Sequence, residues 1–340
     1  MTELQIKEQD ILKAIGQLPR LKLAYVPTPL EDCPRLSSHL GGPRILVKRE
    51  DLTGLAFGGN KARQLEFILG DALDKGADVI VSGASSISNM CRMGAAACAK
   101  LGLRLILLLR GKKEQERQGN LLLDWLSGAE IRMVEEEGDY AALVDAMKQV
   151  ADALRDQGHK PYVMQFIGDG ATLATIAYVG AALELFAQLD ELGTRADRIY
   201  LCSGGRTQAG ILLATKALGR DYRVVGIAPS HGEGAASTIS QSVRDSALRL
   251  GLDVSCSLDE IFNYSDYVGE GFGVASQGSL DAVRLLAETE GIILDPVWTG
   301  KAMAGLVDHI RRGMIGPQET VVFVHTGGQP ALFSYYKDFA

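Results

Sequence analysis

The feature that most constrains the fold is a regular alternation of short apolar, β-prone runs with segments of helical periodicity. Between residues 75 and 164 four strand-like runs alternate with three helical stretches. This order predicts βαβ units around a parallel sheet, because parallel strands need long crossover connections. The expected strands are 78–82, 104–109, 130–134 and 161–164, and the expected helices are 89–101, 115–126 and 140–155.

The same alternation resumes after residue 198 and predicts a second sheet. Strand-like runs at 198–202, 223–227 and 320–325 enclose a helical period at 207–218. A single core seldom grows past about 250–300 residues, so a chain of 340 residues fits two domains. We therefore predict an α/β protein whose larger domain is built from 1–54 and 166–340, with 55–165 inserted as a smaller α/β domain.

Charge and hydropathy exclude two classes of partner. The chain carries 42 acidic against 35 basic residues, a net charge of −7, and has no Lys/Arg-rich block for nucleic acid. The apolar run 101–109 contains Arg104 and is far shorter than the ~20 residues of a membrane-spanning helix. Residues 1–10 lack the basic-then-apolar pattern of a secretory signal, so we expect a cytoplasmic protein with no nucleic-acid or membrane partner.

Cysteines and histidines give no metal-binding pattern. The five cysteines are scattered without a CxxC pair, and the five histidines form no HExxH group. Free thiols fit a reducing compartment. We predict neither a disulfide framework nor a metal site.

One lysine stands in a glycine-rich loop that opens a predicted helix, FGGNKARQLE at 57–66. Glycines allow close approach of a ligand, and the positive end of a helix disfavours the protonated form of Lys61. A lysine with a lowered pKa is a nucleophile for carbonyls and a candidate for a Schiff base. The alternative is a solvated lysine in an ordinary turn.

Two further glycine- or serine-rich stations lie between a strand and a helix. In SGGRTQAG, at 203–210, backbone amides at the helix start suit a phosphate, although a tight turn also needs glycine for steric reasons. The segment matches neither the P-loop nor the GxGxxG fingerprint of nicotinamide-binding proteins. In SGASSISNM, at 82–90, Ser88 is a candidate helix cap with Asn89 in the first turn.

Several motifs together resemble the D-cysteine desulfhydrase and 1-aminocyclopropane-1-carboxylate (ACC) deaminase family. They are EDLTG at 50–54, GGNK at 58–61, the Ser88-Asn89 pair, EGIILDPVWTGKAMAG at 290–305 and HTGG at 325–328. The resemblance runs from about residue 27 to 335. It implies a fold-type II, tryptophan synthase β-like enzyme that uses pyridoxal 5'-phosphate and forms a homodimer, with the larger domain binding the cofactor.

The resemblance also implies roles for individual residues. Lys61 forms the Schiff base, Ser88 lies beside the substrate carboxylate or α-proton, and Asn89 bonds the cofactor's ring hydroxyl. The phosphate is bound by amides of the 203–210 turn, and a pocket wall contacts the substrate. The residues implied for the phosphate are Gly205, Arg206 and Thr207, and Thr299 is implied to face the pyridine nitrogen. The residues implied for the substrate pocket are Ser88, Met90, Phe272, Trp298 and Thr326.

The sequence departs from the family at several of these positions. Thr299 and Thr326 follow the desulfhydrase form and point away from ACC deaminase. Phe272 and Trp298 stand where two tyrosines are expected, which removes two phenols that donate protons. Three more pocket positions differ from the family pattern: Met90, Gln64 in place of a phosphate-binding lysine, and Arg206 in place of Gly or Ser.

We therefore predict a lyase that removes the β-substituent of a small amino acid, such as D-cysteine or L-cysteate, to give a 2-oxoacid and ammonia. Lys61 or Ser88 takes the Cα proton. One alternative is a cofactor-binding protein without turnover; another is a ring-opening deaminase in which Ser85, Ser86 or His231 relays a proton. The Arg206 side chain either grips the phosphate or points to solvent.

Overall fold

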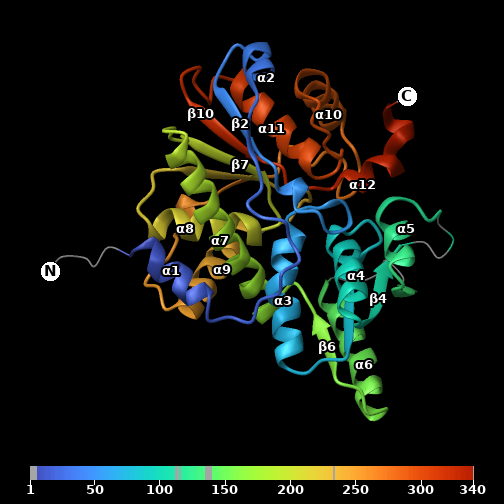
Figure 1. The fold of residues 1–340 in the computed structure, drawn as a ribbon. Coiled ribbons are helices and arrows are strands. Elements are labelled where there is room, and N and C mark those ends of the chain that lie inside the picture. The colour runs from blue at the N-terminus through green and yellow to red at the C-terminus, as the bar shows by residue number, and fades with distance from the viewer. Residues whose placement is uncertain (1–5, 112–113, 115, 135–139, 233, 340) are drawn as a thin grey trace.

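The computed structural model describes residues 6–111, 114, 116–134, 140–232 and 234–339, which form two parallel-sheet units side by side (Figure 1). One sheet has six strands in the order β1-β2-β10-β7-β8-β9, and the other has four in the order β5-β4-β3-β6. All neighbours are parallel except β1 and β2. The predicted α/β class with two sheets is confirmed.

The strand bounds show which parts of the chain build each sheet. The six-stranded sheet uses β1 (Leu30–Asp32), β2 (Arg44–Lys48), β7 (Arg198–Cys202), β8 (Arg223–Ile227), β9 (Phe262–Tyr264) and β10 (Thr320–Val324). The four-stranded sheet uses β3 (Val79–Ser85), β4 (Arg104–Arg110), β5 (Glu130–Val134) and β6 (Pro161–Met164). The smaller sheet thus comes wholly from a segment between β2 and β7, while the domain boundaries themselves stay a prediction.

Helices cover both sheets, and the four that the periodicity predicts, α4, α5, α6 and α8, begin at or within four residues of their predicted starts. The helices are α1 (Glu8–Ile15), α2 (Pro34–His39), α3 (Lys61–Asp74), α4 (Asn89–Leu101), α5 (Gly119–Leu126), α6 (Tyr140–Asp156), α7 (Gly168–Glu191), α8 (Arg206–Ala217), α9 (Ala235–Leu250), α10 (Gln277–Glu290), α11 (Thr299–Arg311) and α12 (Gln329–Leu332). Helix α4 has the predicted bounds. Helix α5 begins later than predicted, at Gly119, and residue 115 lies outside the described residues.

Helix α7 (Gly168–Glu191) is a longer apolar segment than the 101–109 run, which was considered above as a possible membrane-spanning segment. Its 24 residues make it long and apolar enough, by length and composition alone, to cross a membrane, but most of them are buried inside the protein. It packs against α8 and α3. Its apolar length therefore serves the core of the larger unit.

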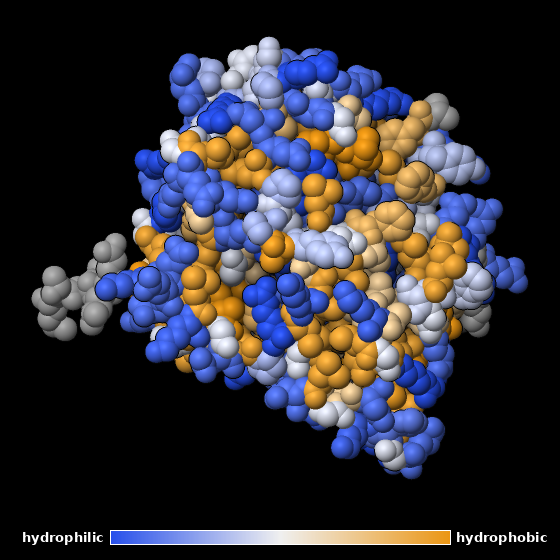
Figure 2. Space-filling model, viewed as in Figure 1, coloured by the Kyte–Doolittle hydropathy of each residue, from blue (hydrophilic) through white to orange (hydrophobic). Residues whose placement is uncertain are grey.

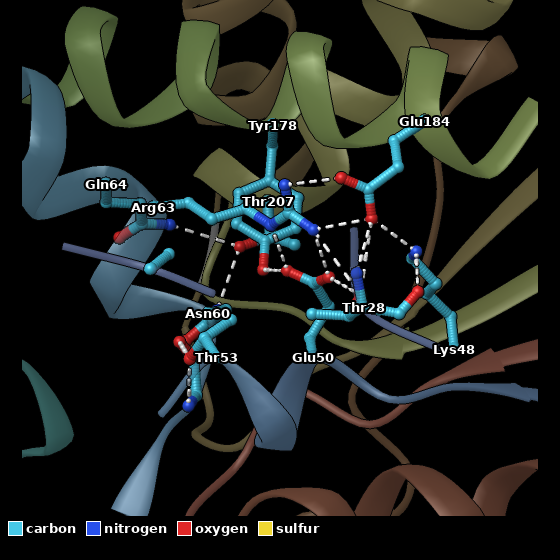
Figure 3. Close-up of polar contacts among 12 residues, drawn as sticks. Thr28, Lys48, Glu50, Thr53, Asn60, Arg63, Gln64, Tyr178, Glu184 and Thr207 are labelled. Carbon is cyan, nitrogen blue, oxygen red and sulfur yellow. Dashed lines mark hydrogen bonds and ion pairs between the residues drawn. The ribbon is translucent and has the colours of Figure 1, made fainter. Parts of the chain in front are cut away.

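A cluster of buried charges ties the start of α3 to the larger unit (Figure 3). Arg63 bonds Glu50 at 2.7 Å and Glu184 of α7 at 2.8 Å, and Lys48 of β2 bonds the same Glu184 at 2.6 Å. The Tyr178 hydroxyl donates to Glu50 at 2.8 Å. We call Lys48, Glu50, Arg63 and Glu184 the charge cluster; it fixes the helix that Lys61 begins.

The loop before α3 is held in an unusual backbone conformation. Ala56 and Phe57 have φ of 44° and 69°, a region that non-glycine residues rarely adopt. The fully buried Arg92 of α4 donates to the carbonyls of Ala56 and Gly58. The loop therefore reaches Lys61 along a path fixed by contacts from the smaller unit.

Candidate active site

A cavity of about 290 Å³ opens where the carboxyl ends of strands from both sheets meet. Such an edge is where ligands bind in parallel α/β proteins. The cavity brings together residues from the three stations found in the sequence. Of the residues predicted for the site, it is lined by Lys61, Ser88, Asn89, Met90, Arg206, Thr207, Phe272, Trp298 and Thr326.

Lys61 is the first residue of α3 and its amine faces this cavity. Burial, with a further contribution from the charge of Arg206, lowers the pKa of Lys61 from 10.5 to about 8. Within the described part of the chain, no hydrogen bond or ion pair engages the amine. A lysine in this state is available as a nucleophile or as a base.

Close backbone contact fixes the loop that presents Lys61. The Asn60 amide donates to the Thr326 carbonyl at 2.9 Å. A Cβ on Gly327 would lie only 2.6 Å from the Gly59 Cα, so these two glycines allow the GGNK and HTGG segments to touch. Two motifs more than 260 residues apart thereby form one wall of the cavity.

The turn before α8 has the features of an anion site. Gly205, at φ 112°, precedes the helix, whose first amides have no partner within the helix itself. The Thr207 hydroxyl accepts from Asn60 Nδ2 at 3.1 Å and Gln64 Nε2 at 3.3 Å. Gln64 Oε1 is buried with no hydrogen-bond partner among the residues described. Neutral donors and helix amides thus converge beside the lysine.

Ser88 and Asn89 lie at the start of α4. The Ser88 hydroxyl caps the helix by accepting from the Cys91 amide at 3.2 Å. Asn89 Oδ1 accepts from Asn120 Nδ2 at 3.0 Å and from Arg92 Nη2 at 3.3 Å. Because its oxygen is held from the protein side, the Asn89 amide nitrogen is left to donate into the cavity.

Thr299 is placed differently from the other predicted residues. It is fully buried, and its hydroxyl donates to Asp295 Oδ2 at 2.6 Å. Asp295 also accepts from the backbone amides of Val297, Trp298 and Thr299. Thr299 does not line the cavity; its neighbour Trp298 does.

Aromatic side chains form the wall that faces solvent. The rings of Phe272 and Trp298 meet edge to face at 6.2 Å, and Phe272 is 47% exposed. Lys301 Nζ donates to the Gly271 carbonyl at 2.8 Å and holds the loop that carries Phe272. Among the described lining residues there is no Asp, Glu, His or Tyr, so this cavity has no strong proton donor apart from its lysine.

The structure adds lining residues that the sequence did not single out. Phe166 and Cys202 follow or end strands β6 and β7, and Pro229 and Ser230 follow β8. Strand ends are the one signal that points to them. Of the three proposed proton relays, Ser85 lines the cavity, whereas Ser86 does not, and His231 lies outside with Nε2 3.1 Å from the Gly269 carbonyl.

Gly205, one of the residues predicted to bind the phosphate, does not line this cavity. Gly205 lines a neighbouring cavity beside the same turn, together with Ser203 and Gly204.

Across the described ranges, no group of three or more His, Cys, Asp or Glu side chains is placed to hold a metal ion.

Comparison with known proteins gives matches over nearly the whole chain. Residues 21–327 match the family described as "Pyridoxal-phosphate dependent enzyme". D-cysteine desulfhydrase of Klebsiella pneumoniae is 38% identical over 338 residues, 96% of this chain and 98% of that one. ACC deaminase of Burkholderia cenocepacia is 38% identical over 330 residues, covering 94% and 97%.

A solved structure agrees with these sequences. The crystal structure of an ACC deaminase homologue superposes with a TM-score of 0.88 at 37% identity, covering 98% of this chain and 99% of that one. The resemblance that the motifs suggested is confirmed.

Proposed function

We propose, since this chain belongs to the family of pyridoxal-phosphate dependent enzymes, that it is a lyase acting at the β-carbon of a small 3-substituted amino acid. The overall reaction consumes the amino acid and one water. It yields a 2-oxoacid, ammonia and the protonated leaving group HX. The observation that carries this proposal is one cavity that joins Lys61 to an anion turn and offers no acid beside them.

The residues of the cavity fit the cofactor that the family uses. Lys61 supplies a free amine for its aldehyde, and the α8 amides with Thr207 supply donors for its phosphate. The Asn89 amide nitrogen supplies a donor for its ring hydroxyl. When bound, pyridoxal phosphate withdraws electrons from the Cα of an amino acid.

The chain itself handles the proton of the Cα. Lys61, with a pKa near 8, accepts and returns a proton close to neutral pH. Ser88 is the second candidate, since its hydroxyl lies on the same cavity and is oriented by the Cys91 amide. Thr299 stays neutral and bonded to Asp295, so it adds no charge to the site.

The lack of an acid in the described lining restricts the leaving group. Opening the ring of ACC expels a carbon that must be protonated, and a placed general acid commonly contributes ~10²–10⁴ in rate. Sulfite departs without protonation, and a thiol with a pKa near ~8.5 needs little help. We therefore favour substrates such as D-cysteine or L-cysteate over ACC.

Release of pyruvate and ammonia from a panel of D- and L-3-substituted alanines tests the proposal. We expect turnover of at least one member and negligible 2-oxobutyrate from ACC. ACC turnover comparable to the best alanine derivative contradicts it. The second candidate, a cofactor-binding protein without turnover, is supported by the phenols missing at Phe272 and Trp298; it predicts a yellow protein that releases neither product.

The assembly and location follow from the same relationship and are also proposals. Apolar side chains gather across the middle of the face in Figure 2. Tyr25, Leu52 and Phe57, which flank the loop before α3, are 73%, 45% and 66% exposed. We infer that a second copy covers such side chains in a cytoplasmic homodimer, where the five buried free cysteines stay reduced. Light scattering that gives a monomer mass contradicts the dimer.

A further inference from the structure

The charges that line the cavity do not balance. Its described lining contains two cations, Lys61 and Arg206, and no carboxylate. Arg206 forms no ion pair with any residue that the structure describes. Its Nε is inaccessible to solvent and has no hydrogen-bond partner there. A largely buried guanidinium without a counter-ion is costly, so the cavity suits a ligand that carries a negative charge.

The Arg206 side chain is only partly accessible to solvent and extends away from its own turn. It donates to the carbonyl of Phe166, 40 residues earlier in the chain, and its Cζ lies 5.4 Å from the centre of the Phe166 ring. Phe166 in turn stacks on Tyr140 of α6 with centroids 5.4 Å apart, and the Phe166 amide donates to the Tyr140 hydroxyl. Arg206 thus packs on the Phe166 ring, which in turn stacks on Tyr140 of the smaller unit.

Arg206 and the reacting lysine line the same cavity. The charge of Arg206 contributes to the lowered pKa of Lys61, so the two cations are within electrostatic reach of each other. The groups that converge on the Thr207 hydroxyl are instead the neutral amides of Asn60 and Gln64. The backbone of the 203–207 turn and these neutral groups can bind a phosphate while the Arg206 guanidinium remains free for another anion.

We propose that Arg206 is a specificity-determining residue whose guanidinium binds an oxyanion on the side chain of the substrate. The preferred substrate is then an amino acid with a second acidic group, a sulfonate or carboxylate. A guanidinium suits this role because it binds such planar or tetrahedral oxyanions through two parallel N–H bonds. The inference rests on the proposed function. The same oxyanion chemistry also occurs in the cofactor's phosphate, and the experiment separates the two sources.

The experiment compares two substrates whose leaving groups both depart without protonation. They are 3-sulfoalanine, which is cysteate, and neutral 3-chloroalanine, each as D and L forms, assayed with the holoenzyme and its Arg206→Gln variant. Loss of the Arg206 charge also changes the pKa of Lys61 and so affects both substrates alike. We therefore expect the loss of kcat/KM for 3-sulfoalanine to exceed the loss for 3-chloroalanine by about 10–100-fold, the scale of a charged hydrogen bond. The Kd of pyridoxal phosphate stays unchanged.

Two controls make the result specific. Arg206→Lys keeps the charge without the paired donors and is expected to lie between wild type and Arg206→Gln. Arg244→Gln removes the same charge from an exposed position on α9 and is expected to change neither substrate. Equal losses for both substrates overturn the proposal, and weaker cofactor binding alongside them assigns the side chain to the phosphate. No change for 3-sulfoalanine overturns it as well.

Failure of the lyase proposal can be told apart from failure of this inference. If the wild-type holoenzyme turns over neither substrate, equilibrium binding is measured from the shift in cofactor absorbance with cysteate and with alanine. The inference then requires cysteate to bind at least about tenfold more tightly than alanine, and Arg206→Gln to remove that difference. Equal binding of the two amino acids contradicts it.

Discussion

Two regions of the molecule hold buried cations in opposite ways. In the charge cluster, Arg63 and Lys48 contact carboxylates of Glu50 and Glu184 at 2.6–2.9 Å (Figure 3). In the cavity, Lys61 and Arg206 have no carboxylate partner in the described chain. The cluster and the cavity lie at the same end of α3, because Lys61 and Arg63 are two residues apart.

The difference separates structural charges from functional ones. A cation that is paired and fully hydrogen-bonded inside the protein needs nothing else, whereas an unpaired buried cation remains costly until a ligand arrives. The charge cluster therefore stabilises the start of α3. Lys61 and Arg206 in the cavity are instead available to bind ligands, an aldehyde for Lys61 and an anion for Arg206. The following predictions test this division.

The largest expected effect is on the reacting lysine. Lys61→Ala is expected to lower turnover by more than about 10³-fold, the scale of losing a covalent catalytic group. Borohydride reduction of the wild-type holoenzyme, followed by peptide mapping, should find the pyridoxyl group on Lys61. Lys75→Ala, at the other end of the same helix, is the control and should retain activity. Labelling at another lysine refutes the assignment.

The next effect concerns the stability of the charge cluster. Arg63→Gln removes the main partner of the buried Glu50 and of the partly buried Glu184, so the free energy of unfolding should fall by about 3–5 kcal/mol. Denaturant titration measures it. Arg104→Gln breaks an exposed pair with Glu130 and should cost at most about 1 kcal/mol. If the two variants lose similar amounts of free energy of unfolding, the charge cluster has no special structural role.

The pH dependence of cofactor capture probes the unpaired lysine. Only the neutral amine reacts, and burial with the Arg206 charge lowers the pKa of Lys61 to about 8. The rate at which the apoprotein takes up pyridoxal phosphate should therefore rise about tenfold from pH 7 to 9 and level off. Stopped-flow absorbance measures the rate. A rise that continues past pH 10 indicates an ordinary lysine.

The smallest effect is expected at Asn120, which holds the Asn89 oxygen. Asn120→Ala removes one of the two donors that orient the Asn89 amide, so the Kd of pyridoxal phosphate should rise about 2–10-fold, the scale of one hydrogen bond. A change in the cofactor's visible spectrum should accompany it. An altered Kd without any spectral change would mean that the effect does not pass through the ring hydroxyl.

The sequence alone predicts those features of the fold and the site that local patterns determine. Helix α4 has its predicted bounds because Ser88 caps it and Gly102, at φ 71°, ends it. Lys61 and Thr207 fall on the cavity because both follow glycine turns at helix starts, where backbone geometry is set locally.

Long-range contacts explain what the sequence left open. The Arg206 side chain contacts the carbonyl and the ring of Phe166, 40 residues earlier in the chain, instead of its own turn. Asn120 supports Asn89 from 31 residues away. Each of these depends on how two distant elements pack.

The most direct test is the stability of the apoprotein when each type of arginine is replaced by glutamine. Arg206→Gln should change the free energy of unfolding by less than about 1 kcal/mol, since it loses only a carbonyl and a ring contact while relieving an unpaired buried charge. Arg63→Gln should lose about 3–5 kcal/mol in the same denaturant titration. If Arg206→Gln destabilises the apoprotein as much as Arg63→Gln does, Arg206 is a structural residue and the division between the two regions is wrong.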